Sequence, residues 1–203
     1  MRIFSLIDFL MTGGNDMKEK KIILASKSPR RKELLSEMGI TFDIYSKEIE
    51  EHLDPDVEPA RAVEKLAEEK AQAVFDECLD AIVIGADTVV CVDHEILGKP
   101  KDREDARRML EKLSGSTHQV IGGVALLSKE KRIVFSCVTT VHFYELSEEQ
   151  ILAYIDSNEP MDKAGAYGIQ GLGKQFVEGI EGDYFNVVGL PVSRVLRALK
   201  EFG

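Results

Sequence analysis

The sequence predicts a mixed α/β protein with one β-sheet flanked by helices. Apolar, β-branched segments such as AIVIGADTVVCVD (81–93) have the composition of buried strands, and residues 60–79 have the spacing of a long amphipathic helix. Strands and helices do not alternate strictly, which favours a mixed sheet over a doubly wound parallel one. With 203 residues, of which 44% are hydrophobic, the chain is long enough to bury such a core.

The first predicted elements are a strand, a helix and a second strand. KIILAS (21–26) is a short apolar run that ends in small polar residues. Ser28 then suits the N-cap of a helix, Pro29 suits its first position because its φ angle is already helical, and Gly39 is a natural stop. TFDIYS (41–46) alternates polar and apolar residues and predicts the second strand.

The rest of the chain is predicted from capping residues and periodicity. Asp102 and Ser147 are placed as N-caps, and the polar turn KEK (129–131) joins two long strands into a hairpin. In order, these elements are an acidic loop (48–59), a helix (60–79), a central strand (81–93), a turn with a short strand (94–100), a helix (103–113), two strands (118–128 and 132–146), a helix (148–157), a glycine-rich segment (163–190) and a final helix (191–202).

An N-terminal segment precedes this pattern. Its apolar run from Ile3 to Met11 is interrupted by polar residues and is too short to span a membrane, so no membrane partner is expected. Met17 stands just before the first periodic strand. We therefore interpret residues 1–16 as a dispensable extension and residues 17–203 as a single domain.

Composition narrows the function classes. A formal net charge of −10 argues against a general nucleic-acid-binding protein, which needs a basic face. Cys78, Cys91 and Cys137 are scattered and form no CxxC pair, which argues against a disulfide framework or a zinc site and predicts a reducing cytoplasm. The histidines are dispersed too, and His118 is interpreted as a hydrogen-bonded structural residue.

Three cations crowd the first turn of the first helix. Arg30, Arg31 and Lys32 lie where the helix dipole already carries partial positive charge. An anion docked at this helix start would attract these side chains, the hydroxyls of Ser26 and Ser28, and the free backbone N–H groups. The alternative is an ordinary capped helix whose basic residues face solvent.

Asp87 interrupts an otherwise apolar strand. Burying a carboxylate without a partner costs several kcal/mol, so we expect Asp87 at a cleft, paired with a cation or a metal ion. The alternative is a bulge or loop residue that caps a neighbour. A hard cation such as Mg²⁺ or Mn²⁺ prefers oxygen ligands, and one carboxylate from the acidic loop could join Asp87 around it. The candidates in that loop are Glu48, Glu50, Glu51 and Asp54.

Two lysines and one glutamine are further candidates. Lys99 follows a turn glycine, and Lys70 interrupts the inner face of the helix 60–79; each is by default a surface lysine, but with the arginines they would complement a triphosphate. Gln170 lies in DKAGAYGIQG (162–171), where glycines would let a ligand approach the main chain. Its carboxamide can donate and accept, which matches the imide edge of uracil or thymine. The alternative is a simple turn built from convenient glycines.

Seven motifs follow one another along residues 21–200: LASKSPRRKELL, IEE, GADTVV, LGKP, LSGSTHQV, EPMDKAGAYGIQG and NVVGLPVSRV. Together they resemble the Maf family, the septum-formation inhibitors also described as house-cleaning nucleotide pyrophosphatases. The resemblance implies an elongated mixed α/β fold similar to that of inosine triphosphatase, with a cleft between two lobes. It implies divalent-metal-dependent hydrolysis of nucleoside triphosphates to monophosphate and pyrophosphate, and it is compatible with a homodimer.

The same resemblance implies roles for the candidate residues. Motif by motif, these are phosphate binding by Ser26, Arg30 and Arg31, catalysis by Asp87, Lys99 and Lys70, metal binding by Glu51 and Asp87, and substrate specificity through Arg30, Thr88 and Gln170. The last three residues resemble the branch of the family that acts on dTTP, UTP and modified pyrimidine triphosphates.

Two other functions stay open at the level of sequence. A regulator of cell division would bind a nucleotide without hydrolysing it, and release of pyrophosphate distinguishes the two. A pyrophosphatase for non-canonical purine triphosphates would need a larger aromatic wall, and only Tyr167, Tyr184 and Phe185 lie near the glycine-rich segment. The sequence does not separate a role of Asp87 as general base from a role as metal ligand.

Overall fold

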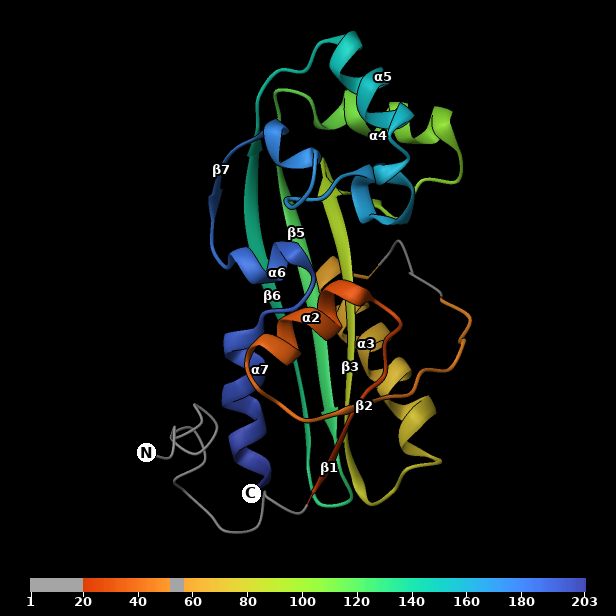
Figure 1. The fold of residues 1–203 in the computed structure, drawn as a ribbon, viewed down its shortest axis with the longest axis vertical. Coiled ribbons are helices and arrows are strands. Elements are labelled where there is room, and N and C mark those ends of the chain that lie inside the picture. The colour runs from red at the N-terminus through yellow and green to blue at the C-terminus, as the bar shows by residue number, and fades with distance from the viewer. Residues whose placement is uncertain (1–19, 52–56) are drawn as a thin grey trace.

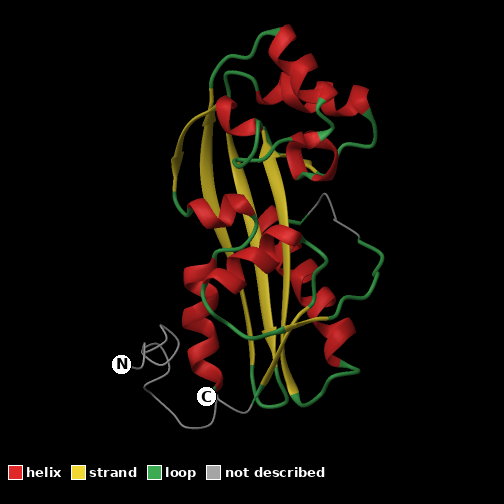
Figure 2. Cartoon of the chain, in the orientation of Figure 1, coloured by secondary structure: helices red, strands yellow, loops and turns green. Residues whose placement is uncertain are grey.

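The computed structural model describes residues 20–51 and 57–203. The predicted extension 1–16 and the candidate Asp54 lie outside the described residues. Figure 1 shows long strands that run along the molecule, with helices at both ends and on both sides, and Figure 2 shows the same arrangement by element type. The predicted fold class, a mixed sheet flanked by helices, is confirmed.

The predicted elements occur in the predicted order, but the glycine-rich segment (163–190) also contains a strand, Val177–Glu181, and a helix, Tyr184–Val188, that were not predicted. The strands are β1 (Lys21–Leu24), β2 (Asp43–Ile44), β3 (Ala81–Val92), β4 (Glu95–Leu97), β5 (Thr117–Leu127), β6 (Arg132–Phe143) and β7 (Val177–Glu181). The helices are α2 (Pro29–Glu37), α3 (Pro59–Phe75), α4 (Arg103–Leu113), α5 (Glu148–Asp156), α6 (Tyr184–Val188) and α7 (Val192–Leu199). Short 3₁₀ helices are η1 (Glu159–Asp162), η2 (Ala164–Ala166), η3 (Gly173–Phe176) and η4 (Lys200–Phe202).

One mixed sheet contains all seven strands. Its order is β2-β1-β3-β5-β6-β7, and β4 pairs with β3 outside this path. β1 is parallel to β2 and to β3, whereas the pairs β3–β4, β3–β5, β5–β6 and β6–β7 are antiparallel. The predicted hairpin around KEK is confirmed as β5–β6, closed by Ser128 N donating to Lys131 O at 2.8 Å. In the described ranges, no helix combines the length and the apolar character needed to cross a bilayer.

Some boundaries differ from the prediction. α3 ends at Phe75 and not at residue 79, because the chain leaves the helix through a turn in which Cys78 N donates to Phe75 O at 2.9 Å. The second predicted strand, 41–46, is reduced to two residues because only Ile23 and Leu24 of β1 pair with it. The final predicted helix ends as a 3₁₀ turn after Leu199.

The predicted caps have different outcomes. Asp102 caps α4 by accepting a hydrogen bond from Asp105 N, and Ser147 caps α5 in a reciprocal box with Gln150. Ser28 occupies the N-cap of α2 but its side chain makes no capping bond. The start of α2 is therefore less strongly capped than predicted.

Alternate residues of β3 pack into cores on opposite faces of the sheet. Ile82 and Ile84 join the core formed with α2 and α7, whereas Ala81 and Val83 join the core formed with α3. This follows from the two-residue period of a strand. A further core joins α4 and α5 to the opposite ends of the long strands, which divides the molecule into two lobes along one sheet (Figure 1).

The backbone of α3 lies directly on the sheet. A Cβ atom at Gly85 of β3 would lie 2.2 Å from Ala67 O, and one at Gly123 of β5 would lie 2.3 Å from Val63 O. Any side chain at either position would push the helix outward. The close approach brings Lys70, one turn after Ala67, against β3.

One edge of β3 is unpaired in its middle. On this edge β1 pairs as far as Ile84, and β4 begins to pair at Val90. Residues 85–89 therefore have no strand beside them on that side within the described part of the chain. Because successive side chains leave a strand on opposite faces, Asp87 and Thr88 reach this gap from its two sides.

We predict that Gly85→Ala destabilises the protein by about 1–3 kcal/mol or more, because the added methyl group overlaps the α3 backbone. Urea unfolding of the purified variant measures the effect. Gly179→Ala is the matched control, since a Cβ there would lie 4.0 Å from its nearest neighbour in the described structure, the ring of His142. Equal unfolding midpoints for the two variants would contradict the close approach.

Candidate active site

A cavity of about 800 Å³ occupies the unpaired edge of β3. The start of α2, α3, the middle of β3, the turn after β4 and the glycine-rich segment all contribute to its walls. Among its lining residues are all nine to which the family resemblance gives a role: Ser26, Arg30, Arg31, Glu51, Lys70, Asp87, Thr88, Lys99 and Gln170. The structure thus brings the candidates together, although their roles stay predictions.

Lys70 lies between two carboxylates. Its ammonium Nζ is 2.6 Å from Asp87 Oδ1 and 2.7 Å from Glu51 Oε1. The side chains of Lys70 and Asp87 are 16% and 14% exposed, whereas that of Glu51 is 56% exposed. Asp87 is therefore paired with a cation at a cleft, as its place in an apolar strand led us to expect.

Arg31 is bound by protein acceptors on three segments. Its Nε donates to Gly189 O at 2.9 Å, one terminal nitrogen donates to Ala86 O at 2.9 Å and to Ser26 Oγ at 3.3 Å, and the other donates to Thr88 Oγ1 at 3.1 Å. Burial lowers the pKa of this guanidinium, and Asp87 partly offsets that effect. Arg31 thus joins α2, β3 and the turn before α7 at the base of the cavity.

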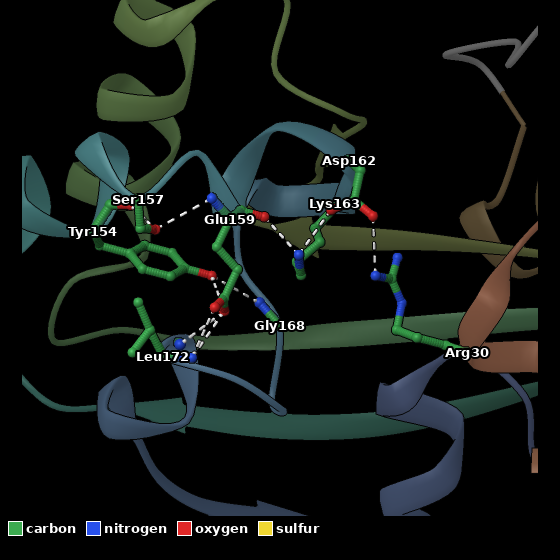
Figure 3. A network of polar contacts seen from close by, with 9 residues as sticks. Arg30, Tyr154, Ser157, Glu159, Asp162, Lys163, Gly168 and Leu172 are labelled. Carbon is green, nitrogen blue, oxygen red and sulfur yellow. Dashed lines mark hydrogen bonds and ion pairs between the residues drawn. The ribbon is translucent and has the colours of Figure 1, made fainter. Parts of the chain in front are cut away.

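Arg30 reaches across the cavity to the other lobe. Its guanidinium donates to Asp162 Oδ2 at 3.0 Å, and Lys163 Nζ lies 2.7 Å from the other oxygen of the same carboxylate (Figure 3). Burial tends to raise the pKa of Asp162, but the bonds from Lys163 and Arg30 outweigh it and lower the pKa. Both arginines of the first turn thus have protein partners, which explains how the cations can stay at a helix start.

Several polar groups that line the described part of the cavity are available to a ligand. Within residues 20–51 and 57–203, the ammonium of Lys99, the carboxamide of Gln170 and Asp87 Oδ2 have no hydrogen-bond partner. The turn that carries Lys99 is fixed by Gly165 N, which donates to Gly98 O at 3.0 Å. These unpaired groups face one cavity from three different segments.

The sequence analysis did not select Asp162 and Lys163, which also line the cavity. Both occur in the quoted motif EPMDKAGAYGIQG, directly before its glycines. A sequence signal was therefore present, namely the two charged residues that directly precede the glycines of this motif. What the sequence could not give is their partner Arg30, 132 residues away.

Glu51 and Asp87 fit a divalent cation in their chemistry. Both are carboxylates bonded to one nitrogen, so they lie side by side, and hard cations such as Mg²⁺ take oxygen ligands. Among the described residues no three His, Cys, Asp or Glu side chains are grouped as a metal site. Phosphate oxygens and water would therefore have to supply the remaining ligands, as is usual for Mg²⁺.

His118 supports the aromatic wall of the cavity. It is 2% exposed, and its Nε2 lies 2.7 Å from the hydroxyl of Tyr167, a lining residue. Burial, together with the charge of His142, lowers the pKa of His118 to about 4, so the ring is neutral. The structural interpretation of His118 is confirmed. Tyr184 and Phe185, the other aromatic candidates, are each 40% exposed and do not line the cavity.

A mixed sheet that carries two lobes and a cation-rich cleft is the arrangement that the motifs led us to expect. The chain belongs to the Maf family, since the model of that family, described as Maf-like protein, matches residues 21–202. Proteins named dTTP/UTP pyrophosphatase from Bacillus velezensis and Bacillus cytotoxicus are each 54% identical to it over 183 residues, which is 90% of this chain and 97% and 96% of those proteins. A protein of the same name from Bacillus cereus is 53% identical over 90% of this chain and 96% of its own length. The resemblance seen in the motifs is confirmed.

We expect Arg31→Lys to destabilise the protein more than Arg30→Lys does. Arg31→Lys leaves buried carbonyl acceptors without the guanidinium fork and is expected to lower the free energy of unfolding by roughly 2–4 kcal/mol. Arg30→Lys changes a partly exposed ion pair and should cost less than about 1 kcal/mol. Urea unfolding of both variants measures the difference. Similar losses of unfolding free energy in the two variants would show that Arg31 does not stabilise the fold more than Arg30.

His118 predicts a pH-dependent stability. Its pKa is lower in the folded protein than in the unfolded chain, so the unfolded state binds the proton more readily and stability is lost as pH falls from about 6.5 toward 4. The loss at pH 4.5 is expected to reach roughly 2–3 kcal/mol. His118→Gln should show a smaller change in unfolding free energy between pH 7.5 and 4.5 than the wild type. Equal changes in both proteins would contradict the assignment.

Proposed function

We propose that this protein hydrolyses nucleoside triphosphates to the monophosphate and pyrophosphate, with dTTP and UTP as its preferred substrates. The observation that carries the proposal is the cavity itself, in which Asp87, held by Lys70, faces the start of α2 across a space with Lys99 and Arg30 on its walls. The names of the Bacillus relatives support the same reaction. We further propose a modified pyrimidine triphosphate as a substrate, in a house-cleaning role.

The triphosphate would bind at the start of α2. The helix presents free backbone N–H groups there, and Ser26 Oγ is held near them by Ser28 N at 3.2 Å. Arg30 and Lys99 supply positive charge from two lobes, and Arg31 adds charge from the base of the cavity. Charge that builds on the leaving pyrophosphate would be stabilised by these groups, which is usually a large part of phosphoryl-transfer catalysis.

The reaction is an in-line attack of water on the α-phosphorus. A bond forms between the water oxygen and this phosphorus while the bond to the bridging oxygen breaks, and pyrophosphate leaves with that oxygen. Asp87 would act through Oδ2, since Oδ1 is held by Lys70. It serves either as the base that takes the water proton or as a ligand of the activating ion.

We propose Mg²⁺ or Mn²⁺ as the cofactor, held by Glu51 and Asp87 together with phosphate oxygens. When bound, such an ion polarises phosphate and lowers the pKa of bound water. The support is the donor set, which consists of two neighbouring carboxylates with no cysteine or histidine grouped with them among the described residues. Lys70, which contacts both carboxylates, would hold them in place as the ion binds.

Base selection is proposed for Arg30, Thr88 and Gln170. The carboxamide of Gln170 can donate and accept together, which suits the imide edge of uracil or thymine. Thr88 Oγ1 is fixed by Arg31 and lines the same cavity. Tyr167 is the one aromatic side chain among the lining residues that the structure describes, which favours the smaller pyrimidine over a purine.

Two further proposals concern the setting of the reaction. We propose a cytoplasmic location, supported by three cysteines that form no disulfide in the described structure. A homodimer, compatible with the Maf resemblance, stays a prediction that light scattering can test.

Asp87→Asn is expected to lower turnover about 10²–10⁴-fold, because it removes the carboxylate that accepts a proton or binds the ion. The assay incubates wild type and variant with dTTP, UTP, CTP, ATP, GTP and ITP in Mg²⁺ or Mn²⁺ and measures monophosphate and pyrophosphate. Asp80→Asn is the matched control, since Asp80 is 93% exposed and, within residues 20–51 and 57–203, pairs only with Lys129 on the surface. A titration with Mn²⁺ then separates the two roles of Asp87. A changed half-saturating concentration indicates an ion ligand, and an unchanged one indicates a base.

The outcomes of this panel distinguish the functions. Catalytic pyrophosphate release with dTTP and UTP supports the proposal. Nucleotide binding without turnover would indicate a regulator, and preferred cleavage of ITP would indicate a purine enzyme. Full activity of Asp87→Asn, or full activity in excess EDTA, would contradict the catalytic and metal assignments respectively.

A further inference from the structure

The loop that carries Gln170 has no strand or helix of its own between Ala166 and Gly173. On one side of Gln170, Ile169 is buried in the core of the lobe that contains α2 and α7. On the other side, Gly171 has a φ angle of +68°, a conformation that other residues rarely adopt. Gln170 itself is exposed toward the cavity, so its direction depends on what holds these two neighbours.

The carboxylate of Glu159 holds the second side of this loop. It accepts backbone hydrogen bonds from Leu172 N at 2.9 Å and from Gly173 N at 3.1 Å, and one from the Tyr154 hydroxyl at 3.0 Å (Figure 3). Burial tends to raise the pKa of Glu159, but these donors outweigh it and lower the pKa. Bonds from backbone N–H groups to an ionised carboxylate are among the stronger ones in proteins.

The glycines of the loop fit around this carboxylate and its neighbours. A Cβ atom at Gly171 would lie 2.6 Å from Glu159 Oε2, and one at Gly173 would lie 2.7 Å from the Tyr154 hydroxyl. The Tyr154 hydroxyl also accepts from Gly168 N at 3.3 Å, so it touches both ends of the loop. Gly171, one of the glycines expected to let a ligand approach, makes room for the carboxylate of Glu159, and Gly173, which follows that stretch, makes room for the hydroxyl of Tyr154.

The segment around Glu159 also makes the contact with Arg30 of the other lobe. Lys163 Nζ donates to the backbone carbonyl of Glu159 and to Asp162 Oδ1, and Asp162 Oδ2 accepts from Arg30 (Figure 3). η1 therefore lies between Arg30 and the loop of Gln170, two of the residues proposed to select the base. Glu159 does not itself line the cavity.

We propose that Glu159 is a positioning residue for base selection, whose ionised carboxylate fixes the loop 168–173 so that Gln170 meets the base edge. The inference rests on the proposed function, in which Gln170 reads the base. Glu159 acts through Gln170 and has no part in binding the phosphates. Loss of its charge should therefore affect the choice of base and leave the phosphate site unchanged.

Glu159→Gln tests this inference, because it keeps the shape of the side chain and removes its charge. We expect the ratio of kcat/KM for UTP over CTP to fall about tenfold, as for the loss of one well-placed hydrogen bond. The inhibition constant of inorganic tripolyphosphate, which has no base, should stay within about twofold of the wild type. Gln170→Ala is the positive control for the ratio, and Glu178→Gln is the matched control, since Glu178 is an exposed residue of β7.

Tyr154→Phe is a second, milder variant. It removes one donor to the carboxylate but leaves both backbone donors, so a smaller fall in the ratio is expected. If Gln170→Ala lowers the ratio and Glu159→Gln does not, the positioning role is wrong while the proposed function stands. An equal loss of tripolyphosphate binding in Glu159→Gln would also overturn it, because that indicates general disruption. If the wild type cleaves no triphosphate, the proposed function itself fails.

Discussion

The unpaired edge of β3 between Ile84 and Val90 is the constraint on which the rest of the structure depends. A strand inside a sheet normally has a neighbour on both sides, and here β1 ends and β4 begins too late to cover the middle. The gap turns one strand into the floor of a cavity, with Asp87 and Thr88 reaching it from opposite faces. It also exposes backbone groups, and Arg31 satisfies one of them by donating to Ala86 O.

The walls of this cavity are held by contacts that do not need a ligand. Two glycines of the sheet let the backbone of α3 lie directly on it, so Lys70 contacts Asp87 directly. Arg30 and Arg31 are oriented by a carboxylate and by carbonyl oxygens. An acidic protein with a net charge of −10 can therefore keep a local group of cations in place. Groups oriented in advance stabilise developing charge without reorganisation, which is the arrangement that phosphoryl transfer requires.

The glycine-rich segment shows that the glycines of a recognised motif can have a second structural reason. Its glycines were assigned to close approach of a ligand, the usual reason for glycine in a phosphate or base loop. In the structure Gly171 and Gly173 make room for Glu159 and Tyr154. The same backbone freedom serves either purpose, and only the position of distant side chains decides between them.

The sequence by itself determined the fold class, the order of the elements outside the glycine-rich segment, two of the three caps considered, and the family, because these depend on local periodicity and on short motifs. It did not predict β7 and α6, which lie within that segment. It also selected nine residues that line one cavity. Only the tertiary structure decided that Arg31 binds protein acceptors, that Arg30 pairs with Asp162, and that the site lies at a gap in the sheet. These features are set by contacts between residues far apart in the chain, and no local pattern of amino acids encodes such a partner.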